Sequence, residues 1–425
     1  GNVSGITDSG TVTVAGNLVA TTDDNNGVID LGQMAVDGTV ALTTNGNGAA
    51  TIVNDAGLSF AASTVTGALS ATATTGDITD SGNLTITGAA TFITGVDESN
   101  IVLDSSGNAF SSSVEMRADA GGEDFGNITF VDSAGIDFAT SAGSNGDLYI
   151  NSSTDGTVGG NLSVTATTGN ITDTVAVVTT GSSTSSFTTS ATNGTITLNT
   201  PASLAGAVTL STTGASGNAT IDNGTTALNI AASSIGGNLT VTSGNVSGIT
   251  DSGTVTVAGN LVATTDANSG VIDLGQLAVT GTMDLTTDGS GNVTIDNGTL
   301  NLDLAASEVG GNLTVTSGAG AGITDSGTVT VAGNLVATTD ANSGVIDLGQ
   351  LAVTGTMDLT TDGSGNVTID NGTSDIVLIA SGIGGDLTLT SGNVSGITDT
   401  GAVTVGGNLV ATTDANSGVI TLDQT

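Results

Sequence analysis

Short stretches in which aliphatic and hydroxyl residues alternate run along the whole chain. Thr254 and Thr256 alternate with Val255 and Val257, and similar stretches such as LVAT, VIDL and LTVTS each end at clusters of Gly, Asn and Asp. A period of two gives a β-strand one apolar face and one polar face. The pattern therefore predicts short strands joined by turns, with Val, Ile and Leu inside. Helix is disfavoured, because β-branched residues and Gly are abundant throughout.

The tripeptide ITD marks a long internal repeat. The sequence numbers of its successive isoleucines differ by 72, 93, 78, 74 and 74, which indicates a repeat of about 74 residues. The repeats in residues 244–425 are nearly identical, whereas residues 78–170 form a diverged and longer unit. The isoleucines are Ile6, Ile78, Ile171, Ile249, Ile323 and Ile397.

Each repeat subdivides at its turn clusters into three segments. The segments 249–270, 271–291 and 292–322 are roughly 20 to 30 residues long, lengths that suit single coils of a β-solenoid. The expected fold is an all-β parallel β-helix (β-solenoid) of roughly 17 coils, with three coils per repeat, continuous over residues 1–425. Coils stacked at about 4.8 Å predict an extended rod.

The composition excludes most catalytic chemistry. The chain has no Cys, His, Lys or Trp, so the usual nucleophiles, proton shuttles and phosphate-binding side chains are missing together. Its formal net charge is -39, and Arg117 is the single basic residue. Such a charge repels nucleic acid and anionic membranes, and no apolar run approaches the roughly 18 residues of a membrane span. We expect a protein that is not an enzyme, binds no nucleic acid, does not insert into membranes and requires no cofactor.

A second recurring element, GNL followed by alternating small and apolar residues, joins the ITD repeats. Together, ITDSG, the TVTV-type strand and AGNL resemble the repeats of filamentous hemagglutinin-like bacterial surface proteins over nearly all of the chain. The resemblance implies a right-handed β-helix that is secreted to the cell surface and acts in attachment, aggregation or matrix building. The glycines of the GNL elements are Gly16, Gly82, Gly160, Gly237, Gly259, Gly311, Gly333 and Gly407.

The sequence thus favours an extracellular structural or adhesive protein. We expect a rod or filament that associates with copies of itself, end to end or laterally, and that meets surface glycans or neighbouring cells. The alternative is an adhesin or matrix-layer module that binds a glycan or a cation, through the phenylalanine-rich unit at residues 78–170 or through the Asp-rich turns.

Calcium is the cation considered, because it prefers oxygen ligands and the turns supply many. The competing interpretation is that these aspartates only form turns, since DANSGVID lacks the closing acidic ligand of known calcium loops and no nonapeptide calcium array is present. The candidate Ca²⁺ ligands are Asp23, Asp24, Asp266, Asp288, Asp340, Asp362 and Asp414.

The diverged unit, residues 78–170, holds most of the unusual side chains, including Arg117, Tyr149 and five of the seven phenylalanines. Either a loop there presents aromatic groups to a partner, or a diverged coil uses its phenylalanines to fill a wider core. Glu123 and Asp124 do not suit a polysaccharide hydrolase, because adjacent strand residues point to opposite faces. The TxT rows recur once in three coils, which argues against an ice-binding lattice.

Overall fold

The computed structural model describes residues 4–23, 26–96, 98–118, 126–139, 147–150, 157–414 and 417–424. The fold is an all-β parallel β-solenoid of about 18 turns, with roughly 22 residues in each turn. The chain divides into two compact units, Gly1–Gly217 and Asn218–Thr425, which we call the first and second units. Within the described ranges, no helix has the length and apolar character needed to cross a membrane. The expectation of one continuous solenoid over residues 1–425 stays a prediction.

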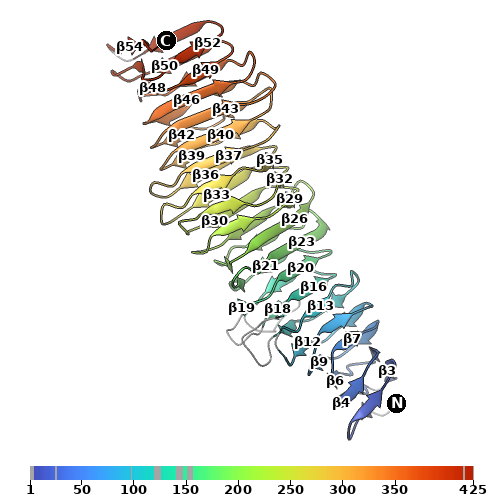
Figure 1. The fold of residues 1–425 in the computed structure, drawn as a ribbon. Coiled ribbons are helices and arrows are strands. Elements are labelled where there is room, and N and C mark those ends of the chain that lie inside the picture. The colour runs from blue at the N-terminus through green and yellow to red at the C-terminus, as the bar shows by residue number, and fades with distance from the viewer. Residues whose placement is uncertain are drawn as a thin grey trace. The chain divides into compact units, whose positions relative to one another are not determined.

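The first unit is built from two main parallel sheets, A and B, which enclose a core (Figure 1). Sheet A contains β1 (Ile6–Thr7), β2 (Val12–Val14), β4 (Ile29–Val36), β6 (Ala50–Asn54), β9 (Leu69–Ala73), β12 (Ala90–Thr94), β15 (Val114–Arg117), β17 (Ile136–Phe138), β18 (Asp147–Ile150), β21 (Ile171–Asp173) and β24 (Ile196–Leu198). Sheet B contains β3 (Leu18–Thr21), β5 (Thr39–Thr43), β7 (Leu58–Phe60), β8 (Ser63–Val65), β10 (Ile78–Asp80), β11 (Leu84–Ile86), β13 (Ile101–Leu103), β14 (Ala109–Phe110), β16 (Ile128–Asp132), β20 (Leu162–Ala166), β23 (Ser185–Thr192) and β26 (Ala207–Thr213). A small third sheet contains β19 (Thr157–Val158), β22 (Val178–Thr179) and β25 (Ser203–Leu204).

The second unit has the same two-sheet construction, and we use the same letters for its sheets. Its sheet A contains β27 (Ala219–Asp222), β30 (Leu239–Ser243), β33 (Leu261–Thr265), β36 (Thr282–Thr287), β38 (Leu302–Leu304), β39 (Ser307–Val309), β41 (Ile323–Asp325), β42 (Val329–Val331), β44 (Ile346–Leu348), β45 (Leu351–Val353), β47 (Val367–Asp370), β50 (Leu387–Ser391) and β53 (Leu409–Thr413). Its sheet B contains β28 (Leu228–Ile230), β29 (Ser233–Ile235), β31 (Ile249–Asp251), β32 (Val255–Val257), β34 (Ile272–Leu274), β35 (Leu277–Val279), β37 (Val293–Asp296), β40 (Leu313–Ser317), β43 (Leu335–Thr339), β46 (Thr356–Thr361), β48 (Ile376–Leu378), β49 (Ser381–Ile383), β51 (Ile397–Asp399), β52 (Val403–Val405) and β54 (Ile420–Thr421).

In the second unit, one repeat occupies three and a half turns, where the sequence predicted three. The strands β31, β34, β37, β40, β43, β46, β48 and β51 pair in that order, so seven pairings connect Ile249 with Ile397, which lies two repeats later. A half-integer number of turns places equivalent residues of successive repeats on opposite sheets. Ile249 therefore lies in sheet B, Ile323 in sheet A and Ile397 again in sheet B.

The core follows from the alternation in each strand. In β40, Leu313 and Val315 are fully buried between the sheets, while the alternating residues Thr314 and Thr316 are partly exposed. Aliphatic side chains of successive turns stack at the same positions, for example Leu313 on Leu335 and Val315 on Ala337. Each turn buries its apolar face against its neighbours, so the stack needs no single large core.

The diverged unit, residues 78–170, contains an unusually long turn. The sequence numbers of the paired residues Ile128 and Leu162 differ by 34, whereas those of the next pair, Leu162 and Ser185, differ by 23. Part of this added length, residues 140–146 and 151–156, lies outside the described residues. The unit therefore departs from the ordinary repeat by lengthening a turn while its strands keep the parallel pairing.

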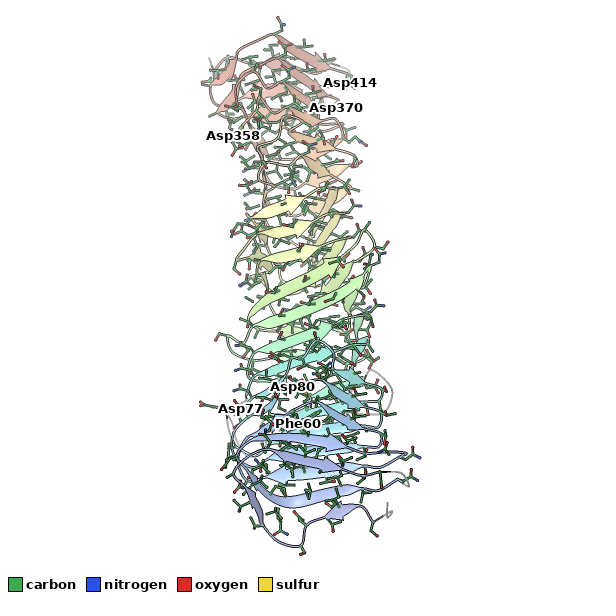
Figure 2. All side chains as sticks on the ribbon, turned by 90° about the vertical axis from the view of Figure 1, so that its right-hand side faces the viewer. Phe60, Asp77, Asp80, Asp358, Asp370 and Asp414 are labelled. Carbon is green, nitrogen blue, oxygen red and sulfur yellow. The ribbon has the colours of Figure 1, made fainter. Side chains whose placement is uncertain are left out.

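The described phenylalanines of the first unit lie in the core. Phe60 and Phe92 are in edge-to-face contact with ring centroids 6.3 Å apart, and Phe92 contacts Phe110 in the same way at 6.1 Å. Phe110 in turn packs on Phe130 at 5.2 Å, and all four side chains are buried. Figure 2 marks Phe60 among the lower coils. The sequence left open whether the phenylalanines contact a partner or fill the core, and these rings fill the core. Phe125 lies outside the described residues.

Candidate interaction surface

Loops gather into stacks on the edges of the second unit. Four successive loops that lead from sheet A to sheet B form the first loop stack: 223–227, 244–248, 266–271 and 288–292. The equivalent loops of the next repeat lead from sheet B to sheet A and form the second loop stack: 297–301, 318–322, 340–345 and 362–366. The half-integer turn count thus presents nearly the same surface alternately on the two edges. A third loop stack, with 371–375, 392–396 and the described part of 414–419, returns to the first edge.

Tight corners of a few residues connect the sheets where loops are absent. The asparagines of two GNL elements form a hydrogen-bond ladder with the asparagine that precedes β27: Asn238 N–H donates to Asn218 Oδ1 at 2.8 Å, and Asn260 N–H donates to Asn238 Oδ1 at 2.9 Å. A Cβ added to Gly259 would collide with the amide oxygen of Asn238, so glycine is required there. The GNL motif therefore stabilises a corner between the two sheets.

The loops are held by hydrogen bonds to their own turn and to the next. In the DANSG loop of residues 266–270, Thr265 Oγ1 donates to Gly270 O at 2.8 Å and closes the loop at its base. Asn268 and Ser269 both have positive φ, 58° and 54°, a conformation that few side chains adopt. Asn268 Nδ2 donates to Gly244 O at 2.7 Å, and the Ser269 hydroxyl accepts a hydrogen bond from Ser290 N–H at 3.1 Å. These bonds connect neighbouring loops of the stack and fix its surface.

Exposed valines mark the tips of two of these loops. Val246 in the first loop stack is 63% exposed, and Val394 in the third is 64% exposed. The two residues are equivalent, lie two repeats apart and so occupy the same edge. The intervening repeat has Gly320 at that position, on the opposite edge.

The structure places four of the seven aspartates proposed as Ca²⁺ ligands in two pairs on neighbouring turns. Asp266 and Asp288 follow Thr265 and Thr287, which are in register on neighbouring turns, and both aspartates are exposed. Asp288 N–H donates to Thr265 O at 2.8 Å. With three coils per repeat, equivalent aspartates would lie three coils apart. The sequence does not show that the two different loops that contain Asp266 and Asp288 lie on adjacent turns.

The remaining aspartates of that set lie in other loops. Asp340 and Asp362 form the equivalent pair in the second loop stack, and Asp414, labelled in Figure 2, lies in the third. Asp23 is exposed in the first unit, and Asp24 lies outside the described residues. Over the ranges that the structure describes, no three acidic side chains come together in a way that could hold a metal ion. Calcium binding by any of these residues stays a prediction.

The aspartate of ITD has a role that the sequence did not reveal. Asp251 Oδ2 accepts a hydrogen bond from Gln276 N–H at 2.8 Å, and Asp325 Oδ2 accepts the equivalent bond from Gln350 N–H at 2.8 Å. Each carboxylate thereby fixes the bend of the following turn. Burial raises the pKa of Asp251, and the nearby carboxylate of Asp273 adds to this rise. This Asp occupies the same place in each repeat, and that was the signal in the sequence from which its role could have been predicted.

Other candidates from the sequence are separated or lie outside the description. Thr256 is in sheet B and its counterpart Thr330 is in sheet A, so the TxT rows do not form one array. Glu123 and Asp124 lie outside the described residues.

Comparison with known proteins identifies a repeat family. A family model described as repeats of unknown function (DUF5649) matches residues 47–117, 216–274, 290–350 and 364–425, together more than half of the chain. No curated protein and no solved structure matches. Three of the four matched segments start at 216, 290 and 364, with the same period as the structural repeat.

Proposed function

Since the chain belongs to the DUF5649 family of repeats, we propose that it works as a repeat array: an extracellular structural and adhesive protein, secreted or held at the cell surface. Its partners are copies of itself, with which it forms filaments, and surface glycans or neighbouring cells. The resemblance to filamentous hemagglutinin-like repeats supports this assignment. The lack of Cys, His and Lys in the sequence favours a structural role over an enzymatic one.

One observation carries the proposal: the loop stacks alternate between the two edges of the second unit. Two equivalent surfaces on opposite edges allow a partner to attach on each side, and such contacts extend an assembly. Repetition along each edge adds avidity without any new contact. The loops also supply hydroxyl, amide and carboxylate groups, which suit glycan hydroxyls. The described phenylalanines are buried, so we assign glycan contacts to the loop stacks instead of the unit at residues 78–170.

Self-association through the edges is tested on the full chain by sedimentation velocity and electron microscopy. We expect concentration-dependent assemblies that weaken when Val246→Asp and Val394→Asp are combined. The matched control combines Thr294→Asp and Thr404→Asp, which add the same charge on a sheet face. Wild-type protein that stays monomeric rejects self-association, and equal loss in both double variants rejects the edges as its site.

A cation-dependent matrix module is the second candidate, favoured by the stacked pair Asp266 and Asp288. Calcium bound only by the folded chain would raise the midpoint of thermal unfolding, by an amount that grows with the concentration of free ion. The combined variant Asp266→Asn, Asp288→Asn should lose this rise, whereas Asp358→Asn, on a sheet face, should keep it. A midpoint that does not change on chelation rejects this candidate and leaves the structural proposal in place.

A further inference from the structure

Three carboxylates lie on successive turns of sheet A in the second unit. Asp303 in β38 is in register with Thr324 in β41, and Thr324 is in register with Asp347 in β44. Asp325 is the neighbour of Thr324 and lies opposite Leu304. We call Asp303, Asp325 and Asp347 the carboxylate column.

Asp303 has an unsatisfied oxygen. Its Oδ1 atom is buried and accepts no hydrogen bond within the described part of the chain. A buried acceptor without a donor is costly, and native proteins contain few of them. The equivalent atom one repeat earlier, Asn229 Oδ1, is buried and unpaired as well. The position thus leaves an acceptor open in two successive repeats.

No basic group is available to neutralise the column. Residues 218–425 contain no Lys, Arg or His, so every charged side chain near the column is acidic. The neighbouring strands contribute Asp284 on β36, Glu308 on β39 and Asp370 on β47. Like charges on adjacent turns oppose the stacking of those turns.

Burial raises the pKa of Asp325, and the carboxylates of Asp347 and Asp303 raise it further, against the hydrogen bonds from Gln350 and Gly349. These groups do not meet as a metal site among the described residues. The small ligand that this environment favours is a proton.

We propose that the carboxylate column is an acid-responsive latch that tightens the stacking of β38, β41 and β44 when it takes up a proton from solvent. The bound proton removes one negative charge from the column and so weakens the repulsion between adjacent turns. A group whose pKa is raised in the folded state holds more protons folded than unfolded. Its contribution to stability is therefore complete below the unfolded pKa and is lost as pH rises through the folded value.

Amide hydrogen exchange of the full chain tests the latch, because it reports local opening strand by strand. Between about pH 7 and about pH 4, after correction for intrinsic exchange, we expect protection in β41 and β44 to rise by about tenfold. Strand β51 is the internal control, because the counterparts of Asp303 and Asp347 beside it are Val377 and Thr421. Its protection should change less.

The variants Asp303→Val and Asp347→Thr introduce the residues that the next repeat already carries, so the fold tolerates them. We expect each to reduce the gain in β41 without abolishing it, because burial is the larger cause of the raised pKa of Asp325. Asp358→Asn, which removes one charge from the opposite sheet, should keep the full gain. A gain of equal size in Asp303→Val and wild type overturns the proposal, as does a wild type without any gain. Calcium that reproduces the gain at about pH 7, and a chelator that abolishes it, would also overturn it in favour of a cation site.

Discussion

Asn297 and Val279 exchange two hydrogen bonds across neighbouring turns. Val279 N–H donates to Asn297 Oδ1 at 2.8 Å, and Asn297 Nδ2 donates back to Val279 O at 3.0 Å. The same amide donates to Asn301 O at 2.6 Å, and Asn297 is fully buried. The chain turns away after β37 and leaves the backbone of β35 without a partner strand on that side. The side chain of Asn297 supplies the hydrogen bonds that such a strand would make.

Replacing Asn297 by Leu should therefore destabilise the second unit. Each buried backbone group left without a partner costs roughly 1–3 kcal/mol. Hydrogen exchange should show the loss first in β35 and β37, since stability in a stack is set by nearest neighbours. Asn297→Asp, which keeps the acceptor and loses the donor, should fall between wild type and the Leu variant. Equal protection in all three proteins would contradict the assigned role.

In the first unit, Asp132 occupies the position that Asn297 occupies in the second unit, so the reverse substitution can be tested there. It is 2% exposed, its Oδ1 accepts Phe110 N–H at 3.1 Å, and burial raises its pKa. Asn54 holds the equivalent bond to Val36 and also donates to Val36 O. We expect Asp132→Asn to stabilise β14 and β16 at neutral pH by about 1 kcal/mol, because it removes a buried charge and adds a donor.

The pH dependence gives the sign of the Asp132 effect. The raised pKa means that the contribution of this residue is favourable below its unfolded pKa and is lost as pH rises through the folded value. The gain from Asp132→Asn should therefore shrink on acidification toward about pH 4. Hydrogen exchange of β14 and β16 at both pH values measures it. A gain that is constant with pH would show that charge is not the cause.

The corner ladder predicts a coupled pair. Gly259→Ala places a methyl group where the amide of Asn238 lies, so it should destabilise the corner by roughly 1–3 kcal/mol. Removing that amide with Asn238→Gly should relieve part of the loss. A double-mutant cycle on unfolding of the second unit measures the coupling. Strictly additive losses would contradict the contact.

The half-integer turn count predicts distances that labels can measure, and the absence of native cysteine makes labelling simple. Spin labels at Val246→Cys and Val394→Cys should lie on one edge and be separated by seven turns, about 34 Å at the spacing of parallel strands. Labels at Val246→Cys and Ala321→Cys should lie on opposite edges, three and a half turns apart. A variant lacking residues 250–323 should move the first pair from the same edge to opposite edges. Labels that stay on the same edge after this deletion would reject three and a half turns per repeat.

The sequence by itself determined the strands, their parallel stacking and the inward face. Val255 and Val257 alternate with Thr254 and Thr256, and this local period of two fixes which side is buried in any sheet with a dry face. The repeat period showed that equivalent strands recur, and turns of about two dozen residues leave a solenoid as the solution that buries them. The burial of the described phenylalanines follows one of the two alternatives that the sequence left open.

Only the tertiary structure decided which turn clusters reverse the chain and which merely bend it. The glycine at Gly253 lies in a bend between β31 and β32 within one sheet, whereas the glycine at Gly259 lies in a corner that crosses to the other sheet. Both clusters look alike in sequence, because the difference depends on backbone pairing with the preceding turn, such as Gly259 N–H to Gly237 O at 2.9 Å. That pairing sets the number of half turns per repeat. It also decides that Asp266 and Asp288 share an edge and that the same loops appear on both edges.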